Sequence, residues 1–250
     1  MSERLSLTLF AHVCARPEAE LDLAEAALLI AEPEYPGLDL GRSREALEAL
    51  GRGARAAVAG ASSGEGEESL SRVVRYLYED AGFHGNDGDY YDPRNSFLNE
   101  VLERRTGIPI TLAVVLMEVC HRAGIEARGV SFPGHFLVRN DTPQGAVLVD
   151  PFAGRPLTRA ELRALHGRAT GKDGDPPPRL FEPATKKQIL TRILHNLLRI
   201  YEERGDTARV RRVLERVQIL LPSEALRQRL EELGGSAPWR SGSSGGGVVN

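Results

Sequence analysis

The chain has 250 residues, of which 41% are hydrophobic and 27% are charged, and its formal net charge at pH 7 is −3. This composition is typical of a soluble globular protein with one large domain, or one domain with an appendage. The charge excludes the global basic field that binds nucleic acid or anionic membranes, and no segment approaches the roughly 18 apolar residues of a membrane span.

The start of the chain and its two cysteines favour a reducing compartment. Cys14 and Cys120 are too few for a disulfide framework, and both lie in apolar helical patterns. His12 interrupts the first apolar run, and no small-residue cleavage signal precedes Arg16. We therefore expect no signal peptide and a cytoplasmic protein.

The first third of the chain has helical patterns. Apolar residues at the helical period predict a helix from Leu21 to Ile30 and a weaker one from Ser43 to Ala59. A third begins near Leu70 and ends at Gly82. The polar segment 61–68 between the last two is predicted to be a flexible connection.

An aspartate-rich loop follows Gly82. Asp87 and Asp89 have the spacing of the first calcium ligands in an EF-hand, but Tyr91 occupies the fifth position and Asp92 replaces the required glycine. We expect a surface loop without a metal. Asn95 then caps a short helix whose apolar residues begin at Phe97.

The centre of the chain combines one apolar helix with short strand patterns. Gly107-Ile108-Pro109 leads into a helix that is apolar on nearly all sides and ends at Gly124, so it is predicted to be buried. The three strand patterns that follow lie at 125–132, 136–139 and 146–149. This order predicts an α+β fold with the helix against a small antiparallel sheet.

The remainder of the chain is again helical. Thr158 and Glu161 form a capping box, 171–178 is a linker, and two helices near 185–204 and 207–221 precede a disordered tail. The predicted organisation has four parts, which are an N-terminal helical region, a core, a helical pair and the tail: 1–82, 83–170, 179–234 and 235–250.

The order of helix, histidine strand and aspartate strand resembles the transglutaminase-like core of the papain-type fold. His135 opens one strand pattern and Asp150 closes the next. In such enzymes a cysteine at the helix start is the nucleophile, the histidine is the base and the carboxylate orients the histidine. The resemblance implies that the cysteine position is occupied here by Pro109, which has no nucleophilic atom.

No other residue replaces that cysteine easily. Cys120 lies eleven residues further along the helix, about 16 Å away at about 1.5 Å per residue. Cys14 belongs to another helix. Thr111 is in the first turn, but a threonine nucleophile needs an adjacent base.

Longer blocks resemble the SirB-type transglutaminase-like family, specifically the first of the two SirB proteins. They cover almost the whole chain, from about residue 15 to about residue 222: AEAALLIAEPEYPGLDL, YYDPRNSFLNEVLERRTGIPITL, FPGHFLVR, LVDPF and LTRILHNLLRIYEERGD. The resemblance implies that the Gly-Ile-Pro step is a family trait. It brings no established reaction.

The two C-terminal helices resemble a single tetratricopeptide repeat. One repeat cannot bury its own apolar face. We expect its apolar residues to dock on the central domain as core: Ile193, Leu197, Ile200, Val210, Val213, Leu214 and Val217. The alternative is a groove that binds a partner.

Two functions remain open at this level. The missing cysteine favours a non-catalytic module that binds a peptide or protein, without a cofactor. The alternative is a hydrolase of amide bonds in which His135 and Asp150 activate water or Thr111 attacks. Three polar residues are candidates for the mouth of the site: Arg94, Asn95 and Asn99. Asn95 also fits a cap and Arg94 a surface ion pair, while His135 and Asp150 also fit a buried structural pair.

Overall fold

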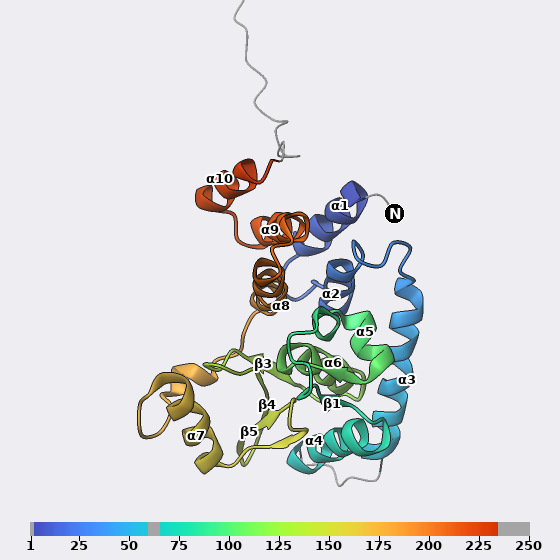
Figure 1. Ribbon diagram of the computed structural model, residues 1–250. Helices are drawn as coiled ribbons and strands as arrows, with labels where there is room; N and C mark the ends of the chain where they lie inside the picture. Colours follow the sequence, from blue (N-terminus) through green and yellow to red (C-terminus); the bar gives the residue numbers. More distant parts are fainter. Residues whose placement is uncertain (1–2, 60–65, 235–250) are drawn as a thin grey trace, which may run out of the picture.

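The structure is a computed structural model that describes residues 3–59 and 66–234. Most of the described chain is helical, and a small sheet occupies the lower half of Figure 1. The α+β prediction is therefore confirmed. The predicted tail at 235–250 and residues 61–65 of the predicted connection lie outside the described residues.

In the described chain, four α-helices precede the first strand, and three of them match the predicted patterns. They are α1 (Glu3–Cys14), α2 (Leu23–Ala31), α3 (Leu40–Val58) and α4 (Gly66–Arg75). A π-helical turn, Tyr76–Asp80, continues α4, and Gly82 follows at a φ of +75°. Helix α4 begins at Gly66, so the predicted connection was too long at its C-terminal end.

The central helix α6 (Pro109–Arg122) is buried along most of its length and packs against α3, α4, α5 (Leu98–Arg104) and the sheet. This burial follows from its nearly continuous apolar sequence. Just before α6, two very short strands pair in parallel: β1 (His84–Gly85) and β2 (Thr106–Gly107). The sequence analysis did not predict this pair, because two-residue strands carry no periodicity.

The main sheet is antiparallel and has four strands in sequential order: β3 (Arg128–Val130), β4 (Leu137–Thr142), β5 (Gly145–Asp150) and β6 (Arg155–Pro156). Strand β3 is shorter than predicted, because 125–127 is irregular and the Ile125 N–H bonds back to the Cys120 carbonyl at the end of α6. The register pairs Val138 with Val149, and this sets the ends of β4 and β5 that carry the candidate site.

The C-terminal part begins with α7 (Arg159–Thr170), whose predicted capping box between Thr158 and Glu161 is present. A 3-10 turn (Pro178–Phe181) then leads to α8 (Lys186–Glu203), α9 (Thr207–Leu220) and α10 (Glu224–Glu232). Helix α8 packs against α6 and α2, whereas α9 packs against α8 and α1. Figure 1 shows α1, α8, α9 and α10 together above the sheet.

The apolar residues of α8 and α9 belong to one continuous core with α2, α3 and α6. The expectation that they form core therefore holds, but only α8 rests on the central helix. Helix α9 packs against α1, so the C-terminal helices contact the N-terminal helix of the described chain.

Candidate functional site

His135 and Asp150 lie side by side at the ends of two strands. His135 follows a tight turn in which Gly134 has a φ of +67° and the His135 N–H bonds to the Phe132 carbonyl. Asp150 is the last residue of β5. The His135 Nε2 atom is 2.8 Å from Asp150 Oδ1, and the two side chains are 14% and 12% exposed. The fold thus brings together the two residues that the sequence singled out.

Asp150 is held as a charged acceptor. Its Oδ1 accepts hydrogen bonds from the backbone N–H groups of Phe152 (2.8 Å) and Ala153 (3.2 Å). Burial alone would raise the pKa of Asp150, but these bonds and the contact with His135 outweigh it and lower the pKa. A charged Asp150 fixes the ring of His135 through Nε2. Among the described residues, Nδ1 of His135 has no hydrogen-bond partner.

The start of α6 offers no comparable free group. Pro109 is buried at the first helical position. The Thr111 hydroxyl donates to the Asn95 carbonyl at 2.7 Å, accepts from the Ile108 N–H at 3.2 Å, and lies 3.1 Å from the Ile108 carbonyl. Thr111 is 1% exposed. Its hydroxyl is therefore engaged with the backbone that shapes the helix start.

Neither cysteine is a reactive thiol. Cys120 is 0% exposed and Cys14 is 3% exposed. Burial raises the pKa of Cys120 from 9.0 to about 12 and that of Cys14 from 9.0 to about 11. Thiols with such pKa values remain protonated at neutral pH and are poor nucleophiles.

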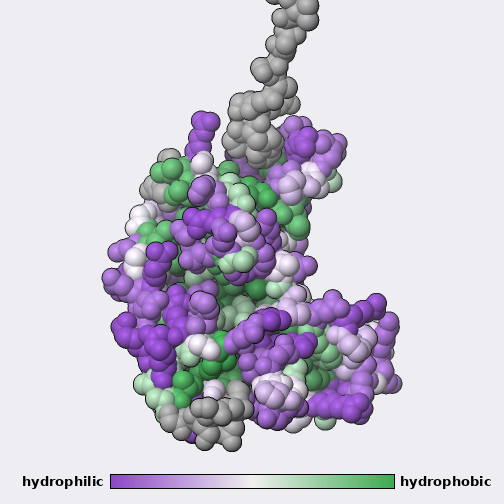
Figure 2. All heavy atoms as spheres, turned by 180° about the vertical axis from the view of Figure 1, so that it is seen from behind, coloured by the Kyte–Doolittle hydropathy of each residue, from purple (hydrophilic) through white to green (hydrophobic). Residues whose placement is uncertain are grey.

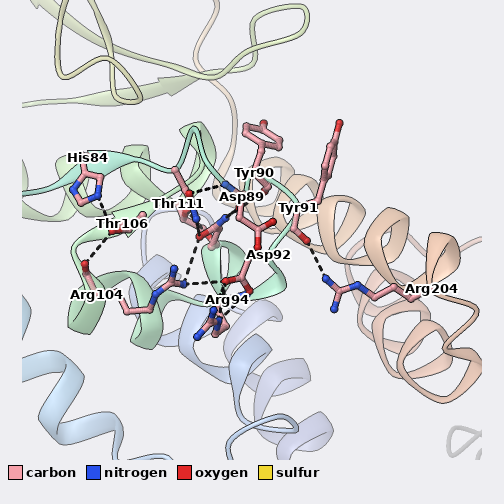
Figure 3. A network of polar contacts seen from close by, with 12 residues as sticks. His84, Asp89, Tyr90, Tyr91, Asp92, Arg94, Arg104, Thr106, Thr111 and Arg204 are labelled. Carbon is pink, nitrogen blue, oxygen red and sulfur yellow. Dashed lines mark hydrogen bonds and ion pairs between the residues drawn. The ribbon is translucent and has the colours of Figure 1, made fainter.

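Figure 3 shows the loop before α5 with its network of polar contacts. Several of these contacts are made by Asn95. Its side-chain nitrogen donates to the Asp89 carbonyl at 2.7 Å, and its oxygen accepts from Asn86 at 3.0 Å. Asn95 is 0% exposed and does not cap α5, so that prediction was wrong. Asp92 caps the short 3-10 turn Pro93–Ser96 instead, and it also pairs with Arg94 at 2.7 Å.

Two tyrosines from this loop are exposed. Tyr90 is 40% exposed and Tyr91 is 46% exposed. The ring of Tyr90 lies 6.1 Å from that of Phe152, two residues after Asp150. Gly85 permits this packing, because a Cβ there would lie 2.6 Å from atoms of the Phe152 ring. An aromatic surface therefore borders the His135–Asp150 pair.

Helix α8 contributes arginines that the sequence analysis did not assign to the site. Arg192 donates from one guanidinium nitrogen to the His135 carbonyl and from another to the Ser131 hydroxyl, both at 2.8 Å. Arg199 lies over the Tyr91 ring at 4.8 Å, and Arg204 donates to the Tyr91 carbonyl at 3.3 Å (Figure 3). The seven-residue spacing of Arg192 and Arg199, which places them on one helix face, was the available signal.

Two other candidates, Arg94 and Asn99, make no direct polar contact with the pair in the described chain. No hydrogen bond or ion pair joins Arg94 or Asn99 to His135 or Asp150 within the described residues. Asn99 is half-buried on α5, and its side-chain oxygen has no partner there. Within 3–59 and 66–234, no group of three or more histidine, cysteine or acidic side chains is placed to hold a metal ion.

None of the helices in the described ranges is long and apolar enough to cross a bilayer.

Comparison with known sequences gives a consistent result. The model of a family described as the Transglutaminase-like superfamily matches residues 42–195. This segment contains the predicted core at 83–170 and extends from α3 into α8, so it includes Arg192. The search of solved structures found no match.

Three similar proteins show how widely the likeness extends. A UPF0162 protein of Xylella fastidiosa is 40% identical over 235 residues, which is 92% of this chain and 83% of that protein. The UPF0162 protein of Pseudomonas aeruginosa is 33% identical over 80% of this chain and 72% of its own length. F-box only protein 21 of Homo sapiens is 33% identical over 145 residues, which cover 54% of this chain but 22% of that protein.

Proposed function

Because the chain belongs to the transglutaminase-like superfamily and, within it, to the UPF0162 family, we propose that it is a transglutaminase-like module that binds a peptide or a peptide segment of a protein without cleaving it. The observation that carries the proposal is the absence of a nucleophile at the start of α6. Pro109 supplies no reactive atom, and the Thr111 hydroxyl is engaged with backbone atoms.

The surface around His135 supports peptide binding. His135 contacts Asp150 through Nε2, and its Nδ1 has no hydrogen-bond partner among the described residues. The Asp150 carboxylate also accepts from the backbone of Phe152, whose partly buried ring packs against the exposed ring of Tyr90. Exposed aromatic rings beside a few fixed polar groups are typical of peptide-binding surfaces. The match to about a fifth of F-box only protein 21 also supports use as a module, since there the segment is part of a longer chain.

We propose a structural role for the C-terminal pair, whose sequence resembles one tetratricopeptide repeat. Helix α8 holds His135 through Arg192 and the Tyr91 loop through Arg199 and Arg204. The pair then serves as one wall of the binding site, and any second contact with a partner protein is secondary to this role.

A hydrolase remains as the second candidate, and the free Nδ1 of His135 favours it. A histidine oriented by a carboxylate activates water when a substrate carbonyl lies nearby. In that case, His135 takes a proton from water as the water oxygen attacks an amide carbonyl, and it gives that proton to the leaving nitrogen when the C–N bond breaks. The structure offers no thiol or free hydroxyl at the helix start for a covalent route.

Selection from a random peptide library on the immobilised full chain tests the proposal. We expect enriched peptides that remain intact by mass spectrometry and bind at least about tenfold more weakly to His135→Ala and Tyr90→Ala. Arg75→Gln is the matched control, because Arg75 is exposed on α4 and no hydrogen bond or ion pair within the described residues joins it to His135, Asp150 or Tyr90. It should bind like wild type.

Other outcomes discriminate clearly. Failure to enrich any peptide, or binding indifferent to both variants, contradicts the module. Cleavage of the enriched peptides that His135→Ala abolishes establishes the hydrolase instead.

A further inference from the structure

A cavity of about 560 Å³ lies between α8 and the 3-10 turn Pro178–Phe181, and one residue of its wall, Arg192, donates to the His135 carbonyl. Figure 2 shows the hollow between the upper helices and the projecting lower lobe. Its wall combines apolar and basic groups, including Leu180, Leu221, Arg179, Arg192 and His195. The one acidic side chain in the wall is Glu182, which is exposed.

Arg192 is unusual among these groups because it is half-buried without a counter-ion. Its hydrogen bonds go to neutral acceptors, the His135 carbonyl and the Ser131 hydroxyl. Its guanidinium lies 5.5 Å from the centre of the Phe136 ring. No carboxylate within the described residues forms an ion pair with it. Burial lowers the pKa of Arg192, as expected for a cation removed from water and left uncompensated.

The larger cavity elsewhere in the molecule, of about 700 Å³, gives the contrast. Its arginines already have partners, since Arg122 pairs with Glu118 at 2.6 Å and with Glu48 at 2.8 Å. Lys186 donates to the Leu21 carbonyl at 2.8 Å. The size of a cavity therefore does not indicate that it binds a charged ligand. An arginine without a counter-ion in the cavity wall does indicate an anionic ligand.

We infer that this cavity is the carboxylate subsite of the peptide-binding site, in which Arg192 pairs with a carboxylate group of the bound peptide. The inference rests on the proposed function for the remainder of the ligand. A guanidinium has five N–H donors in a planar fork that matches a carboxylate. Two nitrogens of Arg192 already donate to neutral groups, which fixes the fork.

The position of Arg192 also gives the bound peptide a direction. Arg192 donates to the backbone carbonyl of His135, a member of the His135–Asp150 pair. Tyr90 is close enough to interact electrostatically with Arg192. A peptide with its carboxylate at Arg192 therefore passes His135 and lays an adjacent side chain on Tyr90 and Phe152. The apolar wall at Leu180 and Leu221 accepts the residue that bears the carboxylate.

The test is an NMR titration of the isotopically labelled full chain with N-acetylglycine and N-acetylglycinamide. The two probes have nearly the same size and differ in the charge of one group. We expect N-acetylglycine to shift the Arg192 Nε–H signal and the backbone signals of Ser131 and His195 in a saturable manner. N-acetylglycinamide should bind at least about tenfold more weakly, because it lacks the charge-assisted bonds.

Two substitutions locate the interaction. Arg192→Gln should weaken N-acetylglycine binding by at least about tenfold, while Arg75→Gln should leave it unchanged. Arg192→Lys keeps the charge but loses the fork, so it should bind more weakly yet still prefer the acid to the amide. If Arg192→Gln fails to fold, the titration of Arg192→Lys still tests the role of Arg192.

A further probe identifies the source of the carboxylate. N-acetylaspartate 1-amide carries its charge on a side chain, whereas N-acetylglycine carries it at a chain end. Tighter binding of either one supports the subsite and assigns the source. Equal shifts from acid and amide, binding unaffected by Arg192→Gln, or a preference for inorganic phosphate over both carboxylates would each overturn the inference.

The subsite and the proposed function fail in distinguishable ways. One outcome is that N-acetylglycine shifts the NMR signals around Arg192, while the selected peptides bind equally well to His135→Ala. This outcome supports the carboxylate subsite and contradicts the proposed module. Selected peptides that depend on His135 but not on Arg192 retain the module and reject the subsite.

Discussion

The start of α6 and the strand ends that carry His135 and Asp150 use their polar atoms in opposite ways. At the helix start, the Thr111 hydroxyl is bonded to backbone atoms, and Pro109 has neither a donor nor a reactive atom. At the strand ends, Asp150 Oδ1 accepts from two backbone N–H groups and contacts His135 Nε2, whereas His135 Nδ1 has no hydrogen-bond partner among the described residues. In the function that we propose, the helix start is therefore structural, while His135 is the group available to a ligand.

The first prediction compares the stability cost of the two regions. Thr111→Val removes a buried hydroxyl and leaves the Asn95 carbonyl and the Ile108 N–H without that partner, so we expect a loss of about 2–3 kcal/mol in the free energy of unfolding. His135→Ala leaves Asp150 bonded to two backbone N–H groups. It should cost about 1 kcal/mol. Urea unfolding followed by circular dichroism measures both values.

The opposite order would break the comparison. If His135→Ala cost more than Thr111→Val, the histidine would be the structural residue and the threonine the dispensable one. Thr142→Val serves as a control, because Thr142 is a threonine in the hairpin between β4 and β5 and its hydroxyl bond is exposed. Its cost should be below about 1 kcal/mol.

The second prediction asks whether the two regions face each other. A Pro109→Cys variant, in a chain where Cys14 and Cys120 are alanine, places a thiol at the helix start. Pro109 is buried, and burial alone raises the pKa of a thiol, as it does for the native Cys14, whose pKa is about 11. The helix N-terminus contributes about 0.3–1 kcal/mol toward an anion, less than one pKa unit. A midpoint below the roughly 8.5 of a free thiol therefore requires His135 as a charged partner.

We expect such an acidic midpoint in the rate of alkylation against pH, and we expect His135→Ala to move it upward. The fold should tolerate the change, since a proline in the first turn donates no helical hydrogen bond. If the pH midpoint of alkylation is that of an ordinary thiol and does not change in His135→Ala, the helix start and the histidine do not face each other. Pro109 would then not occupy the nucleophile position.

Sequence patterns predicted the parts of this site that depend on periodicity. The apolar run of α6 and the strands around His135 and Asp150 could be located because each alternates or repeats over several residues. The exposure of Tyr90 and Tyr91 could not be predicted, because it depends on a loop held by the buried side chain of Asn95 and by arginines far along the chain.

The role of Arg192 was hidden for a different reason. Within α8 it reads as one polar residue of an amphipathic helix. Its importance comes from its contacts with the His135 carbonyl and the Ser131 hydroxyl, which join positions 57 and 61 residues apart, and from the lack of an ion pair with any carboxylate in 3–59 and 66–234.

The last prediction concerns the charge of Asp150 and has the smallest expected effect. Burial opposes ionisation, but the bonds from His135, Phe152 and Ala153 outweigh it, so the folded-state pKa lies below the unfolded value. A carboxylate with a lowered pKa stabilises the fold above its unfolded pKa of about 3.9, and this contribution is lost as the pH falls through the folded pKa.

Asp150→Asn keeps the shape and removes the charge. At pH 7 it should cost about 1 kcal/mol, and the gap to wild type should narrow progressively below about pH 5. Urea unfolding at pH 7, 5 and 4 measures the gap, and Asp141→Asn, at an exposed position on β4, is the control and should change stability little. A gap that stays constant with pH would show that the Asp150 charge is not what holds His135, and the strand ends would then be as purely structural as the helix start.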